Sequence, residues 1–109
     1  MTVEQSDVVD SIGVDIHSGS VVLTVSDHLD WGEGEERHLR LLQEKLNTYL
    51  RFVESDELHI AYPDSMGRPV IIEVVFRHPP SHTAREFLSR ARAAISSVGM
   101  TLTFTEIPV

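Results

Sequence analysis

Two long stretches of this sequence place an apolar residue at every third or fourth position, and shorter stretches with alternating apolar residues flank them. The first spacing is that of an amphipathic α-helix, and the second is that of a half-buried β-strand. Helical spacing runs from about residue 35 to 54 and from about 83 to 98. Alternation predicts strands at about 8–16, 21–25, 58–62, 70–77 and 101–105. The chain is therefore restricted to folds in which helices and a sheet share one core.

Turn and cap residues separate these segments. Residues 17–20, His-Ser-Gly-Ser, supply turn chemistry between the first two strands and predict a β-hairpin. Residues 63–67 form a second predicted turn, and the two prolines at 79–80 end the strongest strand. Ser81 or Thr83 can cap the second helix.

The predicted order of elements is β-β-α-β-β-α-β, which is typical of an α+β domain. Without its first strand the order is that of the ferredoxin-like fold. In that fold the strand before the first helix already has two neighbours, so an additional strand has no free place beside it. We expect a two-layer sandwich with a mainly antiparallel sheet and two helices on one face. This is a ferredoxin-like variant with an extra N-terminal strand, and its strand order stays open.

A length of 109 residues predicts a single domain, residues 1–109, in which about residues 1–7 are flexible. The chain has no cysteine, which excludes disulfides, thiolate nucleophiles and cysteine-bound zinc. Its start has neither the basic residues nor the apolar segment of a signal peptide. The longest apolar stretch, residues 70–76, is too short to span a bilayer. We therefore expect a soluble, cytoplasmic protein.

The charge of the chain is strongly acidic and unevenly distributed. The formal net charge is −8, and the first 36 residues contain nine acidic residues and neither Lys nor Arg. An acidic surface repels phosphate groups and anionic lipids, so we expect neither nucleic acid nor membrane as the partner. The simpler interpretation of the charge is a well-solvated surface.

Catalytic motifs are absent from the sequence. It contains neither the glycine-rich loops that hold phosphates nor the G-x-S-x-G turn of hydrolases. Arg85, Arg90 and Arg92 on the second predicted helix could bind an anion, and Arg85 and Arg92 share one face, but such residues usually form the solvated side of a helix. We predict no catalytic residue, no cofactor and no enzymatic activity.

The segment from Asp27 to Trp31 is the best candidate for a ligand site. Asp27, His28 and Asp30 offer the oxygen and nitrogen ligands that divalent metals accept, and Trp31 lies beside them. The same residues before a helix also make an N-terminal cap with a hydrophobic anchor. All candidate ligands lie within five residues, so the helix cap is the simpler interpretation of this segment.

The second face of the predicted sheet is the best candidate for an interface. If the helices cover the face that carries Leu23 and Ile72, the opposite face is apolar as well. Apolar patches left in water commonly mark binding surfaces. Its partner would be a second copy of the chain or an unidentified protein. Valines among threonines are also normal on a solvated sheet face. The residues concerned are Val22, Thr24, Ile71, Glu73, Val75 and Thr103.

Three segments of the chain, residues 7–15, 21–31 and 38–47, resemble a family of small bacterial proteins of unknown function. The resemblance covers nearly the whole chain, and its most specific part is Ser-Asp-His-Leu-Asp-Trp at 26–31. It implies a bacterial source and a stand-alone domain. No activity is known for that family, so the resemblance assigns no functional residue.

Together these features favour a non-enzymatic protein-binding module that acts as a homodimer or as a subunit of a complex. The alternative is a small-ligand or metal-binding protein, or an enzyme, with a site near residues 27–31.

Overall fold

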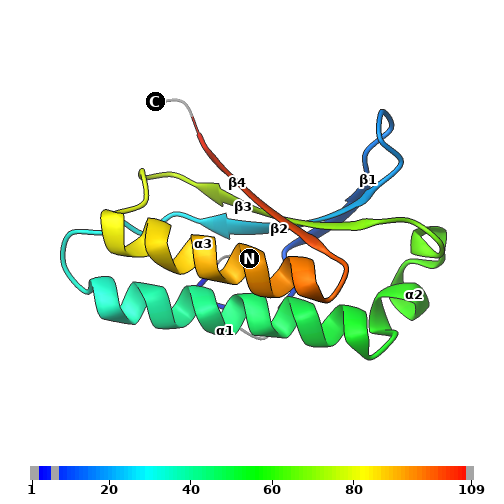
Figure 1. The fold of residues 1–109 in the computed structure, drawn as a ribbon, viewed down its shortest axis with the longest axis horizontal. Coiled ribbons are helices and arrows are strands. Elements are labelled where there is room, and N and C mark those ends of the chain that lie inside the picture. The colour runs from blue at the N-terminus through cyan, green and yellow to red at the C-terminus, as the bar shows by residue number, and fades with distance from the viewer. Residues whose placement is uncertain (1–2, 6–7, 108–109) are drawn as a thin grey trace.

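A four-stranded sheet and two long helices form two layers in the computed structural model, which describes residues 3–5 and 8–107 (Figure 1). The strands are β1 (Ser11–Val14), β2 (Val21–Asp27), β3 (Val70–Phe76) and β4 (Thr101–Glu106). The long helices are α1 (Glu35–Glu54) and α3 (His82–Ser97). A short helix α2 (Glu57–Ala61) and a 3₁₀ turn η1 (Pro63–Ser65) connect α1 to β3.

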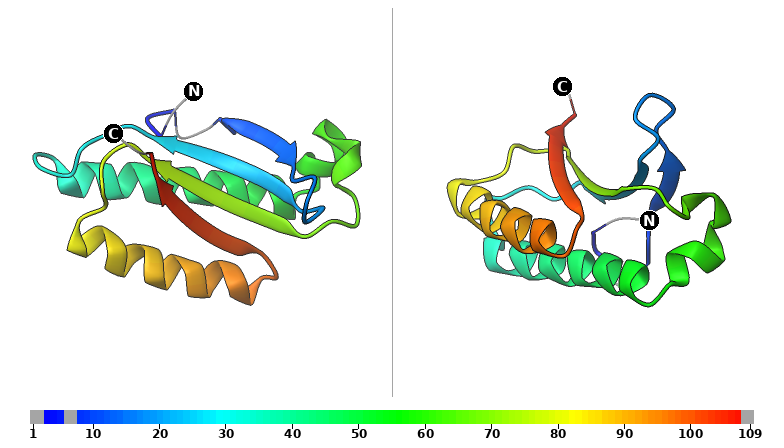
Figure 2. Two further views of the ribbon diagram at one scale, coloured as in Figure 1. Left: turned by 90° about the horizontal axis from the view of Figure 1, so that it is seen from above. Right: turned by 45° about the vertical axis from the view of Figure 1, so that its right-hand side comes forward.

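The strands lie in the sheet in the same order as in the sequence, β1-β2-β3-β4. β1 pairs antiparallel with β2, whereas β2 with β3 and β3 with β4 are parallel. Connections between parallel strands are right-handed. The connections from β2 to β3 and from β3 to β4 advance in the same direction across the sheet, so both helices lie on one face. Figure 2 shows α1 and α3 on the same side of the sheet. The predicted α+β class and the placement of both helices on one face are therefore confirmed.

The sheet is mixed, and the prediction of a mainly antiparallel, ferredoxin-like arrangement is wrong in this respect. Each long helix carries the chain between adjacent strands, which makes the two strands parallel. β1 occupies the free edge of β2 and displaces no other strand. The extra strand thus has a place that the ferredoxin-like order would not give it.

The strand predicted at 58–62 is also wrong, because this segment is the helix α2. Leu58 is buried in the core, but Ile60 is 79% exposed. Three apolar residues in five do not distinguish a strand from a turn of helix. β3 already lies between β2 and β4, so it has no free edge for a strand at 58–62 to join.

The core lies between the sheet and the two long helices. Alternate residues of β2 and β3 point toward the helices and are fully buried, as are the facing residues of α1 and α3. The main residues are Val21, Leu23, Val25, Ile72, Val74 and Phe76 from the strands, and Leu42, Leu46, Tyr49, Ala84, Leu88 and Ile95 from the helices. Ser81 caps α3 by accepting a hydrogen bond from the backbone N–H of Ala84 at 3.1 Å.

The start of the chain packs beside β2. Val3 is buried, and its N–H donates to the carbonyl of Ser26 at 2.9 Å. The carbonyl of Gln5 accepts a hydrogen bond from Lys45. That about residues 1–7 are flexible stays a prediction, since these contacts do not test it. Residues 1–2 and 6–7 lie outside the described residues.

No helix in the described part of the chain is both long enough and apolar enough to cross a membrane.

Candidate functional site

Asp27 and His38 form a buried pair where the sheet meets α1. Asp27 is the last residue of β2, and its position in the alternation turns its side chain toward the helices. His38 lies in the first turns of α1, and both residues are 2% exposed. His38 Nε2 is 2.7 Å from Asp27 Oδ1 and 2.6 Å from Oδ2. Nδ1 is 3.0 Å from the carbonyl oxygen of Asp30. The loop between β2 and α1 is therefore tied to the helix.

The acceptors around His38 determine where its hydrogens lie. The carbonyl of Asp30 can only accept, so Nδ1 must carry a hydrogen. Nε2 and the Asp27 carboxyl share the other hydrogen bond, and Asp27 Oδ1 also accepts from the N–H of Leu29 at 3.1 Å. Both ring nitrogens are engaged inside the protein. This pair holds structure together and does not present a base to a substrate.

Trp31 extends this buried cluster. Its ring stacks on His38 with centroids 3.5 Å apart and an interplanar angle of 13°, and it lies 5.9 Å from the ring of Phe76. The residue is 8% exposed. Its indole N–H is buried without a hydrogen-bond partner in the described part of the structure. Trp31 is thus the hydrophobic anchor of the loop.

The structure does not gather the four residues of the predicted ligand site around one point. His28 is half-exposed and forms an ion pair with Glu4 at 3.2 Å. The side chain of Asp30 accepts from the N–H of Gly32 at 3.1 Å. Among the described residues, no group of three or more His, Cys, Asp or Glu side chains is arranged to hold a metal ion. Asp27 and Trp31 belong to the buried cluster instead.

A small hollow of about 200 Å³ adjoins this loop. The ring nitrogens of His38 are already engaged, and neither Asp27 nor His28 lines the hollow, so the ligand-site alternative depends on its charged lining residues. The hollow is lined by Leu29, Asp30, Glu33, Gly34, Arg37 and His38.

Arg85 and Arg92, the other candidate pair, have separate contacts. Arg85 forms an ion pair with Glu106 at 3.4 Å. The guanidinium of Arg92 lies 5.4 Å from the ring centroid of Phe104. Each cation serves to attach α3 to β4, which argues against a shared anion site.

A second buried cluster centres on Lys45, a residue of α1 that is fully buried. Its Nζ donates to the carbonyls of Gln5 at 2.6 Å and Val8 at 2.5 Å, and to Asp10 Oδ1 at 2.7 Å. These three acceptors match the three hydrogens of an ammonium group. Asp10 Oδ2 accepts in turn from the N–H of Ser26 at 3.0 Å. The cluster connects the N-terminal segment, β2 and α1.

Tyr49 lies one turn further along α1 and completes this network. Its hydroxyl donates to the carbonyl of Thr24 at 2.5 Å and accepts from the N–H of Asp10 at 2.7 Å. Burial is the main reason why the pKa of Tyr49 is raised, and the nearby charge of Asp10 raises it further. The hydrogen bond from the backbone of Asp10 opposes this shift.

We expect Tyr49 to make folding sensitive to alkaline pH. In the unfolded chain a tyrosine ionises near pH 10, so the raised pKa in the folded state favours folding below that pH. This contribution is lost as the pH rises above about 10. Urea unfolding should show a steep loss of stability above pH 10, and Tyr49→Phe should make that loss less steep. An equally steep loss in Tyr49→Phe would contradict the assignment.

His38, Lys45 and Tyr49 were not predicted as members of polar clusters. A signal for them exists in the sequence, because with Leu42 they recur at spacings of three and four residues on one face of α1. A histidine and a lysine in the apolar stripe of a helix must find buried acceptors. Those acceptors lie 8 to 40 residues away in the sequence, and spacing alone does not identify them.

The sheet face opposite the helices carries the six residues of the predicted interface. The register places Val22 beside Ile71, and Glu73 between Thr24 and Thr103. All six are partly exposed. In Figures 1 and 2 neither α1 nor α3 covers this face, which we call the open face. Glu73 is its central charge, and no ion pair of Glu73 occurs within the described residues.

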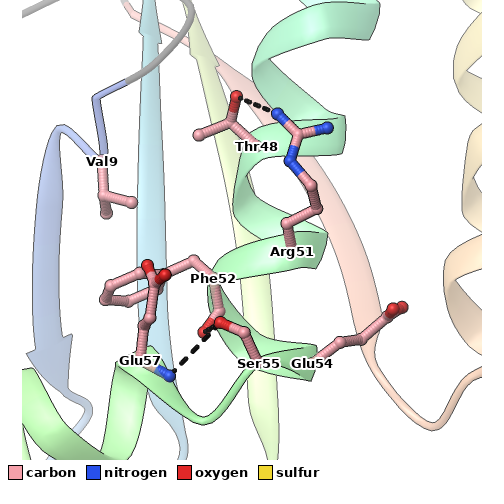
Figure 3. A pocket seen from close by; sticks show the side chains of 7 residues that line it. All are labelled: Val9, Thr48, Arg51, Phe52, Glu54, Ser55 and Glu57. Carbon is pink, nitrogen blue, oxygen red and sulfur yellow. Dashed lines mark hydrogen bonds between the residues drawn. The ribbon is translucent and has the colours of Figure 1, made fainter.

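A hollow of about 570 Å³ lies beside the end of α1 (Figure 3). Polar groups around it bond to each other: Arg51 donates to Thr48 Oγ1 at 3.3 Å, and the N–H of Glu57 lies 3.5 Å from Ser55 Oγ. Glu54 points away from the others in Figure 3. The lining therefore offers no convergent set of groups for a ligand. It consists of Val9, Thr48, Arg51, Phe52, Glu54, Ser55 and Glu57.

Comparison with known proteins supports the family resemblance. Residues 1–108 match a family model described as "Family of unknown function (DUF6572)". Comparison with curated proteins and with solved structures found no match. The predicted resemblance to a family of unknown function is confirmed, and the bacterial source stays a prediction.

Proposed function

The chain belongs to a family of unknown function (DUF6572), and from the chemistry of its surfaces we propose that it is a non-enzymatic protein-binding module. The observation that carries this proposal is the open face, where apolar residues surround Glu73, a carboxylate with no ion pair among the described residues. The occupant we propose is a basic protein that brings a lysine or arginine to Glu73.

The apolar part of the open face favours a protein partner. Val22, Ile71 and Val75 come from the two central strands and are half-buried in the free chain. Their remaining exposed surface is released from water when a flat protein surface covers it. Threonines of β2 and β4 flank the patch and supply the more polar border that interfaces usually have.

Glu73 determines which kind of partner fits. Covering the open face removes water from this carboxylate, and a buried charge without a partner is costly. A lysine or arginine opposite Glu73 compensates that cost. The net charge of −8 also attracts a basic protein over longer distances.

A homodimer through the open face is the less favourable arrangement. A two-fold axis through a self-complementary patch brings the same residues of both copies together. Two Glu73 carboxylates would then approach each other at the centre of the interface. This repulsion favours a complex with a different, basic protein.

The experiment captures the partner with the tagged chain and compares variants of matched chemistry. We expect the wild type to retain one basic protein in stoichiometric amount and Val75→Glu to lose it. Ala93→Glu adds the same charge on an exposed position of α3 and should retain it. With the purified partner, Glu73→Gln should weaken binding by about tenfold or more, and added salt should weaken the wild-type complex.

Several outcomes would overturn this proposal. Equal capture by Val75→Glu and Ala93→Glu would remove the open face from the interface. An acidic partner, or no partner at all, would count against the assigned occupant. Light scattering that shows a dimer of the wild type and a monomer of Val75→Glu would establish the homodimer instead.

A further inference from the structure

We propose a second docking surface on the opposite side of the molecule, a groove between α1 and α3 that binds an amphipathic helix with acidic residues near one end. It is independent of the open face, since α1 and α3 lie on the other side of the sheet (Figure 2).

Two adjoining hollows of about 170 and 340 Å³ form this groove. They share Gln43 of α1 and Phe87 of α3, so they lie next to each other between the two helices. Figure 2 shows the helices running side by side beneath the sheet. The apolar residues of the lining are Leu39, Leu50, Phe87, Ala91 and Ala94, which keep exposed surface, and Leu46 and Ile95, which are buried.

The shape of the groove suits a helix better than a small molecule. Ligand pockets usually measure about 300–1,000 Å³, so one hollow is smaller than this range and the other is near its lower end. One wall carries Ala91 and Ala94, whose small side chains allow another backbone to approach α3 closely. An amphipathic helix fits such a groove with apolar residues spaced by three and four positions.

The charge at one end of the groove indicates which helix would fit. Arg40 of α1 and Arg90 of α3 line the wider hollow. Neither forms an ion pair in the described part of this acidic protein, although most other arginines there contact an acceptor or a ring. Glu36 is the single acidic residue of the lining. Carboxylates of a docked helix would meet the two guanidinium groups in charge-assisted hydrogen bonds.

The probe is a synthetic amphipathic peptide of about 18 residues, long enough to form a helix. It carries leucines at helical spacing on one face and two glutamates near one end, and a control peptide has lysines in place of the glutamates. Binding to the whole chain is measured by fluorescence anisotropy of a labelled peptide. We expect the glutamate peptide to bind at least tenfold more tightly than the lysine peptide.

Variants test both the charge and the shape of the groove. Arg40→Glu combined with Arg90→Glu should weaken the glutamate peptide at least tenfold, whereas Arg77→Glu, an exposed residue after β3, should not. Ala94→Trp fills the groove and should abolish binding. Ala93→Trp places the same side chain on a neighbouring exposed position outside the lining and should leave binding unchanged.

The proposal is overturned if neither peptide binds at millimolar concentration, if both bind equally, or if Ala93→Trp and Ala94→Trp act alike. Val75→Glu should bind the glutamate peptide as the wild type does. This result separates the groove from the open face, because the failure of one surface leaves the other unaffected.

Discussion

Replacing Lys45 with alanine is expected to lower the free energy of unfolding by about 3–5 kcal/mol, as for the loss of one partner from other buried ion pairs. The side chain is fully buried, and its ammonium group satisfies Asp10 and the carbonyls of Gln5 and Val8. Without it the carboxylate of Asp10 stays buried and loses its cation. A domain of this size is stable by only about 5–15 kcal/mol, so this loss is a large part of the total.

Urea unfolding followed by Trp31 fluorescence measures this effect. Arg51→Ala changes an exposed cation of the same helix and should cost less than about 1 kcal/mol. In a Lys45→Met, Asp10→Leu double variant both charges are absent, so much of the loss should be recovered. A loss below about 1 kcal/mol in Lys45→Ala would show that the cluster does not stabilise the fold.

Asp27→Ala is expected to cost about 3 kcal/mol, the second largest effect. The substitution removes the acceptor of the buried His38 Nε2 and of the part-buried N–H of Leu29, so each group loses its hydrogen bond. Because Trp31 stacks on His38, its fluorescence in the folded state should change as well. The measurement is urea unfolding together with the emission spectrum before unfolding.

Asp30→Ala is the matched control for Asp27→Ala. His38 bonds to the backbone carbonyl of Asp30, which the substitution leaves in place. The variant loses only the exposed contact to Gly32 and should cost less than about 1 kcal/mol. Equal losses in the two variants would show that the buried pair has no special contribution.

Both clusters are built on α1, and each attaches a segment that is neither helix nor strand. The His38 cluster holds the loop after β2, and the Lys45 cluster holds the chain before β1. Side chains of α1 thus position both the segment that precedes β1 and the loop that follows the end of β2. This attachment explains why polar residues occupy the apolar stripe of the helix. Stability alone does not explain it, because apolar residues of similar volume often make a protein equally stable.

Local periodicity was sufficient to identify the two long helices and the strands predicted at 21–25 and 70–77, which the structure gives as Val21–Asp27 and Val70–Phe76. The alternation in these strands also identified the face that the helices cover, because side chains on a strand alternate strictly between its two sides. The same alternation identified Val22, Ile71 and Val75 as residues of the opposite face. These features depend on neighbours within one element, so the amino-acid sequence alone determined them.

Only the tertiary structure decided how the elements pair. Whether 58–62 forms a strand depends on how the sheet is paired, and in the structure this segment is a helix in the connection between the adjacent strands β2 and β3. The partners of His38 and Lys45 depend on which distant segments reach α1. An isolated histidine or lysine in a sequence has the same local pattern whether it is solvated or buried. Pairing and burial result from competition between distant segments, which the spacing of residues along the chain does not record.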